Sequence, residues 1–428
     1  HERGSGYGHT HKVEFGFHSE DTFYFGTWDG SAEYYSRTKR KFRDTNAWMH
    51  IMVVVDSTQA TNTNRLKWYF NGEQYSIDGA MFDAGPSYPA QNWVFNSNTW
   101  SHNIGRYVAS SGASNYLDAS LSDFCFVDGQ ALTPSSFGET DTDTGEWRIK
   151  DFTAGDITWG TNGYRILKDG NSINDVSSNA HNFTADTGTL TKTEDNPSNV
   201  FATMNFAGSD YGNYTLTKGN LVCYGGNNND WKSAFISNIG ATSGKYYWEI
   251  RLNTCTSYNI TGVCRSDKTW TNSNVYSNGG FNGVQSSTSA GGLGIYSQTG
   301  ASMGGALYIG GTSVSLTAND IIMYALDLDN KKMWIGKNGV WADDGNSGNT
   351  GNPSTGAYPL WGTGEFTTGS HYLPASIIYY TNAHVYNFGN GYFETTQVSA
   401  GTNASGNGIF EYDVPTGYTA LSTKGLNL

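Results

Sequence analysis

The sequence contains MHIMVVVD at residues 49–56, followed after a polar connection by RLKWYFNG at residues 65–72. The same device recurs as DIIMYALD at residues 320–327 and KKMWIGKNGVW at residues 331–341. Each copy is an apolar run that ends in Asp, then an aromatic-rich run and an Asn-Gly pair. Asn-Gly supplies the positive φ angles of a tight hairpin, and β-branched and aromatic flanks strengthen the signal. The copies lie more than half the chain apart, which predicts two separate β-sandwiches.

Length and composition favour many short strands. The chain has 428 residues, which exceeds one ordinary hydrophobic core. Glycine is abundant at 54 residues, and no stretch of about 12 or more residues has a convincing helical period. We predict an all-β protein with two antiparallel, jelly-roll-like β-sandwich domains joined by an irregular strap.

Charge and cysteine content exclude several classes of protein. The net charge is −13, and no basic cluster is larger than the run from Arg37 to Lys41, so nucleic acid is not an expected partner. No run of about 18 apolar residues is present, and we expect no membrane insertion. The four cysteines are too few for a disulfide framework; Cys255 and Cys264 are interpreted as reduced packing residues, with a pair between them left open. The chain begins at His1 without Met, so we expect a processed or partial piece.

Residues 1–150 are predicted to form the first sandwich. The segment from Trp48 to Phe137 resembles the concanavalin A-like, laminin-G-like jelly roll, most closely in its VVVD strand and its YFNG turn. Such domains usually open with one or two strands that are not found before His11. The resemblance therefore implies that the first strands are missing or trimmed.

Two segments lack a sustained strand pattern. Residues 151–200 are rich in turn residues, and a long connection without regular structure is unusual inside a compact domain. We therefore predict an irregular interdomain strap there. The tail at residues 391–428 contains GIFEYDVPTGY and is too short for its own core, so we expect it to dock on a neighbour or a partner chain.

Residues 201–390 are predicted to form the second sandwich. KYYWEI at residues 245–250, GLGIY at residues 292–296 and the second hairpin device at residues 320–341 resemble the SPRY domain in order and spacing. That fold is also a bent two-layer sandwich. The resemblance implies a binding surface formed by loops at one end of the sandwich.

Three further segments narrow the resemblance. ALTPSSFGE at residues 131–139, NPSNVFATMN at residues 196–205 and the tail are similar to bacteriophage structural proteins in which a laminin-G-like domain precedes SPRY. This implies a virion protein at the virion surface, either a tail fibre or an exposed capsid decoration. Its implied partners are other virion proteins and further copies of itself, with a trimer as one option. The ligand is not specified.

Several aromatic residues lie in or beside polar, Gly/Asn-rich segments instead of within alternating strands. Exposed rings can stack on sugar faces while Asn and Asp bond to hydroxyl groups, so this pattern indicates glycan binding. Each ring taken alone fits core packing as well. Trp68, Trp248 and Trp334, by contrast, lie within predicted strands and are assigned to the core. The candidate ligand-binding residues are Trp270, Tyr276, Phe281, Trp341 and Trp361.

One run of carboxylates has to be considered as an enzyme site. Glu139, Asp141 and Asp143 alternate, as in jelly-roll glycoside hydrolases, where retaining enzymes hold two carboxyl groups about 5 Å apart. Thr140 and Thr142 stand where apolar residues would anchor a strand, so we interpret the run as a solvated loop.

Metal ligands are few. His9 and His11 face one side of a predicted strand, without an evident third ligand. Asp327 and Asp329 end a strand and are interpreted as turn caps. No other cofactor is expected beyond a structural Ca²⁺, for which the candidate ligands are Asp343, Asp344 and Asn346.

The sequence as a whole predicts a non-enzymatic phage virion appendage that binds host-surface glycan. Stacking and hydrogen bonds would supply the affinity, and multiple copies can raise avidity by roughly 10²–10⁴. Three alternatives stay open: a purely structural capsid-decoration or fibre protein, a glycan depolymerase of jelly-roll type that uses Glu139 and Asp141, and a secreted bacterial adhesin.

Overall fold

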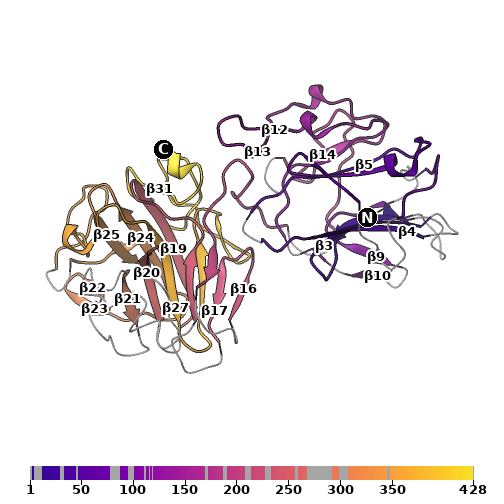
Figure 1. The fold of residues 1–428 in the computed structure, drawn as a ribbon. Coiled ribbons are helices and arrows are strands. Elements are labelled where there is room, and N and C mark those ends of the chain that lie inside the picture. The colour runs from indigo at the N-terminus through magenta and orange to yellow at the C-terminus, as the bar shows by residue number, and fades with distance from the viewer. Residues whose placement is uncertain are drawn as a thin grey trace. The chain divides into compact units, whose positions relative to one another are not determined.

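The structure is a computed structural model of the chain. It divides into two compact units, His1–Leu190 and Thr191–Leu428, each described here by itself (Figure 1). None of the helices among the described residues has the length and apolar character needed to cross a membrane. The structure describes residues 2–3, 12–28, 33–44, 47–77, 87–94, 101–109, 112–114, 116–117, 119–168, 172–186, 190–207, 214–226, 233–255, 259–267, 292–297, 307–344 and 348–427.

Both units are built from antiparallel sheets, which confirms the predicted all-β fold. Within the described residues of the first unit, one sheet has the order β4-β3-β2-β1-β8 and another the order β5-β6-β7. The strands of the first sheet are β1 Glu2–Arg3, β2 Lys12–Phe17, β3 Thr22–Trp28, β4 Glu33–Lys41 and β8 Ser101–His102. Those of the second are β5 Ile51–Val55, β6 Leu66–Phe70 and β7 Glu73–Tyr75, with the 3-10 helix η1 Asn62–Asn64 before β6.

The core of this sandwich lies between the two sheets. Phe23 and Phe25 of β3 meet Leu66, Trp68 and Phe70 of β6 in one buried cluster. Burial alternates along β6, as a strand with one face on the core requires. The Phe23 ring stands edge-on to Trp68 at 5.8 Å between centroids, a favourable geometry for aromatic pairs. The prediction that Trp68 is a core residue is confirmed.

The structure places most of the predicted strap at residues 151–200 inside the first unit. Phe152 and Trp159 are buried in a cluster with Phe137. The buried Arg165 guanidinium binds the Asp123 carboxylate at 2.6 Å and lies over the Phe152 ring at 3.7 Å. The remaining elements described in the first unit are β9 Tyr107–Ala109 paired with β10 Gly112–Ser114, β11 Phe124–Phe126 with β14 Tyr164–Ile166, β12 Gly138–Thr140 with β13 Trp147–Ile149, and the 3-10 helices η2 Pro134–Ser136 and η3 Ala154–Asp156.

The second unit is also a two-sheet sandwich. Its described residues form a sheet of order β15-β18-β27-β20-β21 and a larger sheet of order β16-β17-β28-β19-β24-β25-β26. The first sheet contains β15 Met204–Phe206, β18 Ser233–Ser237, β20 Asn259–Arg265, β21 Gly292–Ser297 and β27 Tyr372–Ile378. The larger sheet contains β16 Thr215–Thr217, β17 Val222–Tyr224, β19 Lys245–Thr254, β24 Ile321–Asp327, β25 Lys332–Lys337, β26 Val340–Trp341 and β28 Ala383–Asn387. The smaller elements are β22 Leu307–Ile309, β23 Thr312–Val314 and the 3-10 helix η4 Thr363–Glu365.

Aromatic and polar side chains join these two sheets. Trp248 of β19 and Tyr324 of β24 are buried neighbours whose rings stack at 5.0 Å. The Tyr324 hydroxyl hydrogen bonds to Thr261 of β20, so this face of the larger sheet is turned toward the smaller one. The predictions that Trp248 and Trp334 are core residues are confirmed. None of the four cysteines, all of which the structure describes, forms a disulfide.

Both predicted Asn-Gly turns are confirmed. Asn71 and Asn338 each have a φ of 49°, and the glycines that follow have φ of 80° and 85°. The Asn71 side-chain oxygen accepts a hydrogen bond from the backbone N–H of His50 at 2.9 Å. Asn338 does the same for Ile321 at 2.8 Å. The turn between β6 and β7 is thus tied to the beginning of β5, and the turn between β25 and β26 to the beginning of β24.

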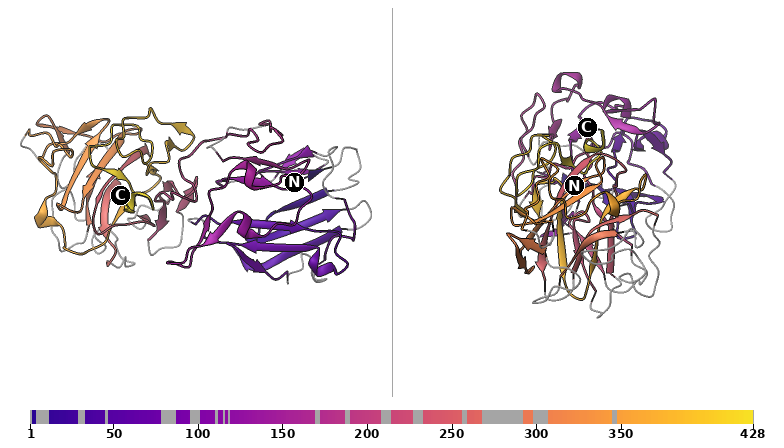
Figure 2. Two further views of the ribbon diagram at one scale, coloured as in Figure 1. Left: turned by 90° about the horizontal axis from the view of Figure 1, so that it is seen from above. Right: turned by 90° about the vertical axis from the view of Figure 1, so that its left-hand side faces the viewer.

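The tail at residues 391–428 packs on the second unit itself. Phe410, Tyr418 and Leu421 are buried in the main core, and the C-terminal end lies against the strands of this unit (Figures 1 and 2). Its elements are β29 Tyr392–Phe393 paired with β30 Thr396–Gln397, β31 Thr419–Ala420 paired in parallel with β19, and the 3-10 helix η5 Gly425–Asn427.

The Asn338 clamp generates a stability prediction. Asn338→Ala removes the bond to Ile321, removes a second bond to Asp320 at 2.8 Å, and places Ala at a positive φ. We expect the free energy of unfolding of the second unit to fall by about 1–3 kcal/mol in urea denaturation. Asn338→Gly loses the same bonds without backbone strain and should cost less. If both variants have the free energy of unfolding of the wild type, the Asn338 hydrogen bonds do not contribute to stability.

Candidate functional site

A row of side chains crosses four strands of the larger sheet in the second unit. The strand register pairs Glu249 of β19 with Met323 of β24, Met323 with Gly336 of β25, and Gly336 with Trp341 of β26. Directly paired residues in antiparallel strands share a face. Since the adjacent Trp248 and Tyr324 face the other sheet, this row lies on the opposite face, which we call the outer face.

The glycine in this row lets its neighbours pack closely. A Cβ atom at Gly336 would lie 2.8 Å from the Val340 carbonyl oxygen, 3.0 Å from Met323 Cε and 3.2 Å from Trp341 Cε3. The thioether and the indole therefore fill the space that a side chain at this position would need. The Trp341 ring is half-buried and rests edge-on against Tyr247 at 6.3 Å between centroids.

The buried carboxylate of Glu249 holds the tail over the outer face. Its Oε1 accepts hydrogen bonds from the backbone N–H of Tyr412 at 2.9 Å and from the Tyr247 hydroxyl at 2.8 Å. Its Oε2 accepts from the backbone N–H of Glu411 at 2.9 Å and from Asn387 Nδ2 at 3.1 Å. The carboxylate therefore fixes two successive residues of the tail.

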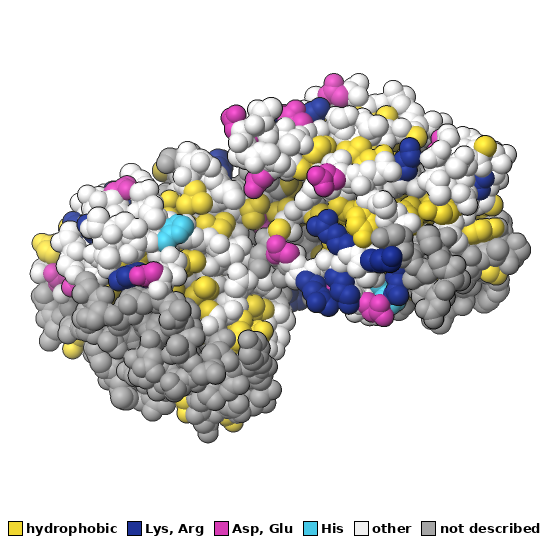
Figure 3. Space-filling view, viewed as in Figure 1, with side chains coloured by type: hydrophobic (Ala, Val, Ile, Leu, Met, Phe, Trp, Pro, Cys, Tyr) yellow, Lys and Arg dark blue, Asp and Glu magenta, His cyan; other side chains and the backbone are white. Residues whose placement is uncertain are grey.

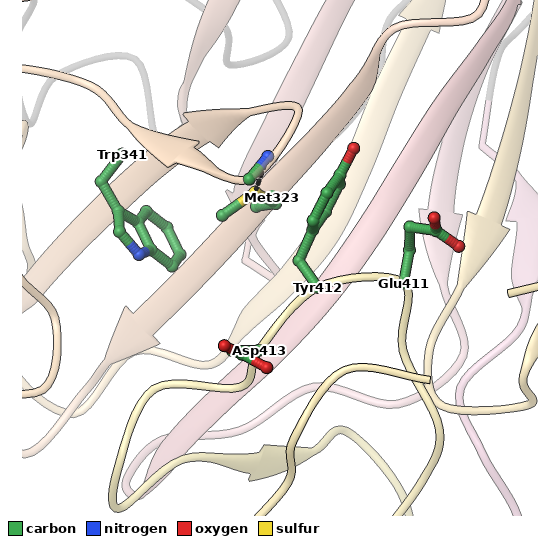
Figure 4. A pocket seen from close by; sticks show the side chains of 6 residues that line it. Met323, Trp341, Glu411, Tyr412 and Asp413 are labelled. Carbon is green, nitrogen blue, oxygen red and sulfur yellow. Dashed lines mark hydrogen bonds between the residues drawn. The ribbon is translucent and has the colours of Figure 1, made fainter. Parts of the chain in front are cut away.

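Together, the sheet and the tail form an open pocket. Its volume is roughly 350 Å³, near the lower end of the range for small-molecule sites. Figure 4 shows the Asp413 carboxylate beside the space between the Trp341 and Tyr412 rings, with the Glu411 side chain on the other side of Tyr412. The lining residues are Met323, Gly339, Trp341, Glu411, Tyr412 and Asp413.

Hydrogen bonds orient both carboxylates of the pocket. Asp413 Oδ1 accepts from the backbone N–H and the hydroxyl of Thr402 at 2.7 and 2.8 Å, and these bonds lower the pKa of Asp413. Glu411 accepts from the backbone N–H and hydroxyl of Ser399, both at 2.7 Å. Within the part of the chain that the structure describes, the Trp341 indole N–H, the Tyr412 hydroxyl and Asp413 Oδ2 have no hydrogen-bond partner. A ligand would therefore find two aromatic rings, donors and an ionised acceptor.

The structure describes two of the five predicted ligand-binding residues, and only one of these two lines the pocket. Trp341 lines the pocket. Trp361 is a correction: it is 2% exposed, and its backbone N–H binds the Met333 carbonyl at 3.2 Å, so the ring belongs to the core and cannot stack on a ligand. Trp270, Tyr276 and Phe281 lie outside the described residues.

The structure describes two of the three proposed Ca²⁺ ligands. Asp343 is buried, and its two oxygens accept hydrogen bonds from the Gly311 N–H and the Thr350 hydroxyl. Asp343 therefore has the turn partners that the sequence did not reveal. Asp344 is half-buried, and Asn346 lies outside the described residues. Among the residues that are described, no three His, Cys, Asp or Glu side chains are grouped as a metal site would require.

The other metal candidates were His9 and His11, which lie outside the described residues. The interpretation of Asp327 as a turn cap is confirmed, because its side chain accepts from the backbone N–H of Asn330 at 2.9 Å. Asp329 instead accepts from the N–H of Gly244 at 2.8 Å, which lies in a segment distant in sequence.

The candidate enzyme carboxylates form part of a hairpin. Arg148 Nη2 binds Glu139 at 2.8 Å and Arg148 Nη1 binds Asp141 at 2.9 Å. Asp141 also accepts from the backbone N–H groups of Asp143 and Thr144, which lower its pKa. Both carboxylates thus stabilise the β12–β13 connection.

The short basic run lies on β4, which is one edge strand of the sheet β4-β3-β2-β1-β8 in the first unit. Lys and Arg side chains gather on one face of this unit in Figure 3. Arg37 is paired with Glu20 at 2.8 Å, and Arg43 with Asp21 at 2.9 Å. Acidic neighbours therefore offset part of this positive charge.

The sequence did contain a signal for the contact between Glu249 and the tail, but sequence reasoning missed it. Glu249 stands in KYYWEIRL, where it interrupts a strand that is buried on both faces. A buried carboxylate needs compensating hydrogen bonds, so its position predicts polar partners. The partners could not be identified in advance, because Glu411 and Tyr412 lie more than 160 positions away.

Comparisons with known proteins give a weak structural similarity to a solved structure. No protein-family model matches the sequence, and no curated protein is similar to it. Among solved structures, the chain is similar to the SPRY domain of human HERC1, with 17% sequence identity and a TM-score of 0.25. The match covers 40% of this chain and 91% of that one.

The buried Glu249 carboxyl group predicts a specific pH dependence of the free energy of unfolding. Burial raises the pKa of Glu249 from 4.5 to about 7, against the hydrogen bonds that lower it. A carboxyl group with a raised folded-state pKa contributes stability that is fully present below about pH 4.5 and is lost as pH rises through about 7. Glu249→Gln lacks this contribution. The stability difference between wild type and variant should therefore favour wild type by about 3 kcal/mol more at pH 4.5 than at pH 8.

Urea denaturation of both proteins across this range provides the measurement, because the other titrating groups cancel in the difference. Parallel stability curves would contradict the raised pKa. They would mean that four donated hydrogen bonds outweigh burial and keep the carboxylate ionised.

Proposed function

We propose that this chain is a non-enzymatic binding protein whose second unit holds a glycan in the pocket between Trp341 and Tyr412. The observation that carries the proposal is the combination of two partly exposed rings with unused polar groups in one hollow. Rings cover the apolar face of a sugar, while the Trp341 N–H and Asp413 Oδ2 are placed to bond its hydroxyl groups. A volume of roughly 350 Å³ fits one or two sugar units at the end or along the side of a chain.

The setting that we propose is a bacteriophage virion, as a fibre or an exposed decoration that contacts host-surface glycan. This part rests on the sequence resemblance of residues 131–139, residues 196–205 and the tail to phage structural proteins. Its partners there would be other virion proteins and further copies of this chain. A shallow pocket of modest affinity suits such a setting, since repeated copies multiply weak binding.

An enzymatic role has less support from the side chains. The carboxylates of Glu139 and Asp141 share one arginine, and Asp141 also caps a turn, which are structural tasks. In the pocket, Asp413 and Glu411 are hydrogen bonded in place, and their pairing with aromatic rings is sufficient for recognition without bond cleavage.

Trp341→Ala tests the proposal. Loss of a central aromatic anchor typically costs about 2 kcal/mol or more, which is roughly a 30-fold loss of affinity. We expect wild-type protein to bind on an array of glycans and bacterial polysaccharides, and the variant to lose that binding while circular dichroism stays unchanged. Tyr358→Ala is the control, because Tyr358 is 48% exposed in the same unit and lies outside the pocket.

Equal binding by Trp341→Ala and wild type would place any glycan site elsewhere. Release of reducing ends in the same wells would make the protein an enzyme. Absence of both glycan binding and reducing-end release would favour a purely structural role.

A further inference from the structure

We propose that the pocket selects a ligand that carries positive charge, in the form of an amino sugar with a free ammonium group. This inference rests on the proposed glycan-binding function and names the class of sugar. The juxtaposition that carries it is one oriented carboxylate, Asp413, beside two aromatic rings, Trp341 and Tyr412, in a pocket whose described lining contains no basic side chain.

The charge of the lining has one sign. Glu411 and Asp413 contribute two carboxylates, and among the described residues no lysine, arginine or histidine lines the pocket. The buried Glu249 carboxyl group lies directly beneath the tail, bonded to the backbone of Glu411 and Tyr412. An anionic sugar, such as a uronic acid, would therefore meet repulsion with no cation to offset it.

Asp413 is prepared to pair with a cation. Thr402 occupies Oδ1 with two hydrogen bonds, which fixes the carboxylate and leaves Oδ2 unpaired among the described residues. Glu411 differs, because Ser399 binds both of its oxygens. In Figure 4 the Asp413 carboxylate lies beside the space between the rings, whereas Glu411 lies on the other side of Tyr412. The two acids thus have separable roles in charge recognition.

The rings favour the same ligand. An ammonium group over the face of Trp or Tyr is attracted by the negative face of the π system, and the attraction grows as water is displaced. The Trp341 ring is fixed by its contact with Tyr247, and the backbone of Tyr412 is held by its hydrogen bond to Glu249. A Cβ atom at Gly339 would lie 3.0 Å from Tyr412 Cδ1, so glycine at this turn lets the ring lie close to the hairpin. The rings therefore need little ordering when the ligand binds.

The experiment is isothermal titration with three oligosaccharides of equal length. Oligomers of glucosamine and of N-acetylglucosamine share one backbone and differ in the charge of the amine, and oligomers of galacturonate supply the anionic case. We expect the glucosamine oligomer to bind about tenfold more tightly than the acetylated one, and the galacturonate oligomer to bind most weakly. Asp413→Asn should abolish the tenfold preference, since the amide can still accept from Thr402 but carries no charge. Glu411→Gln removes the same charge from the other acid and should keep most of the preference.

The outcomes separate this inference from the function on which it rests. Equal or tighter binding of the acetylated or anionic oligomer, lost in Trp341→Ala, would overturn the charge preference and leave glycan binding in this pocket standing. Absence of binding by all three oligomers, on an array that also shows no binding by wild type, would overturn both. A glucosamine preference that Asp413→Asn leaves unchanged would contradict the assignment of Asp413.

Discussion

The buried carboxyl group of Glu249 is the constraint on which the pocket depends. A carboxylate without partners in a protein interior is far too costly to keep, so it has to be neutral or fully hydrogen bonded. Here two donors come from its own unit's sheet and two from the backbone of the tail. Departure of the tail would leave both oxygens short of a partner in an apolar setting. The tail is therefore held in one position, and that position brings Tyr412 and Asp413 beside Trp341.

Much of the architecture follows from local chemistry that a sequence displays. Asn71 and Asn338 adopt the positive φ angles that Asn-Gly pairs favour, and the strands on either side alternate or run apolar as buried sheets require. The boundary of the first unit could not be read in the same way. Strands of three residues, such as Tyr164–Ile166, are too short to show a period, and the Arg165–Asp123 pair that anchors them joins positions more than 40 residues apart.

The site was only partly visible in the sequence, for a related reason. Trp341 was identified because it lies beside a polar, Gly/Asn-rich segment, yet the same reasoning selected Trp361, whose burial depends on pairing with Met333. Whether a ring in a loop is exposed is decided by what the fold brings onto it. The close packing of Met323 and Trp341 around Gly336 could not be predicted either, because it depends on the register across β24, β25 and β26.

The pocket exists before any ligand arrives, because Glu249 holds the backbone of the tail. Amide hydrogen exchange of Glu411 and Tyr412, resolved residue by residue in the free protein, tests this most directly. We expect both amides to exchange slowly, with protection close to that of the neighbouring strand β19, and Glu249→Ala to remove their protection while β19 stays protected. Fast exchange of both amides in the free wild-type protein would mean that Glu249 does not hold the tail and that the pocket has to form around its ligand.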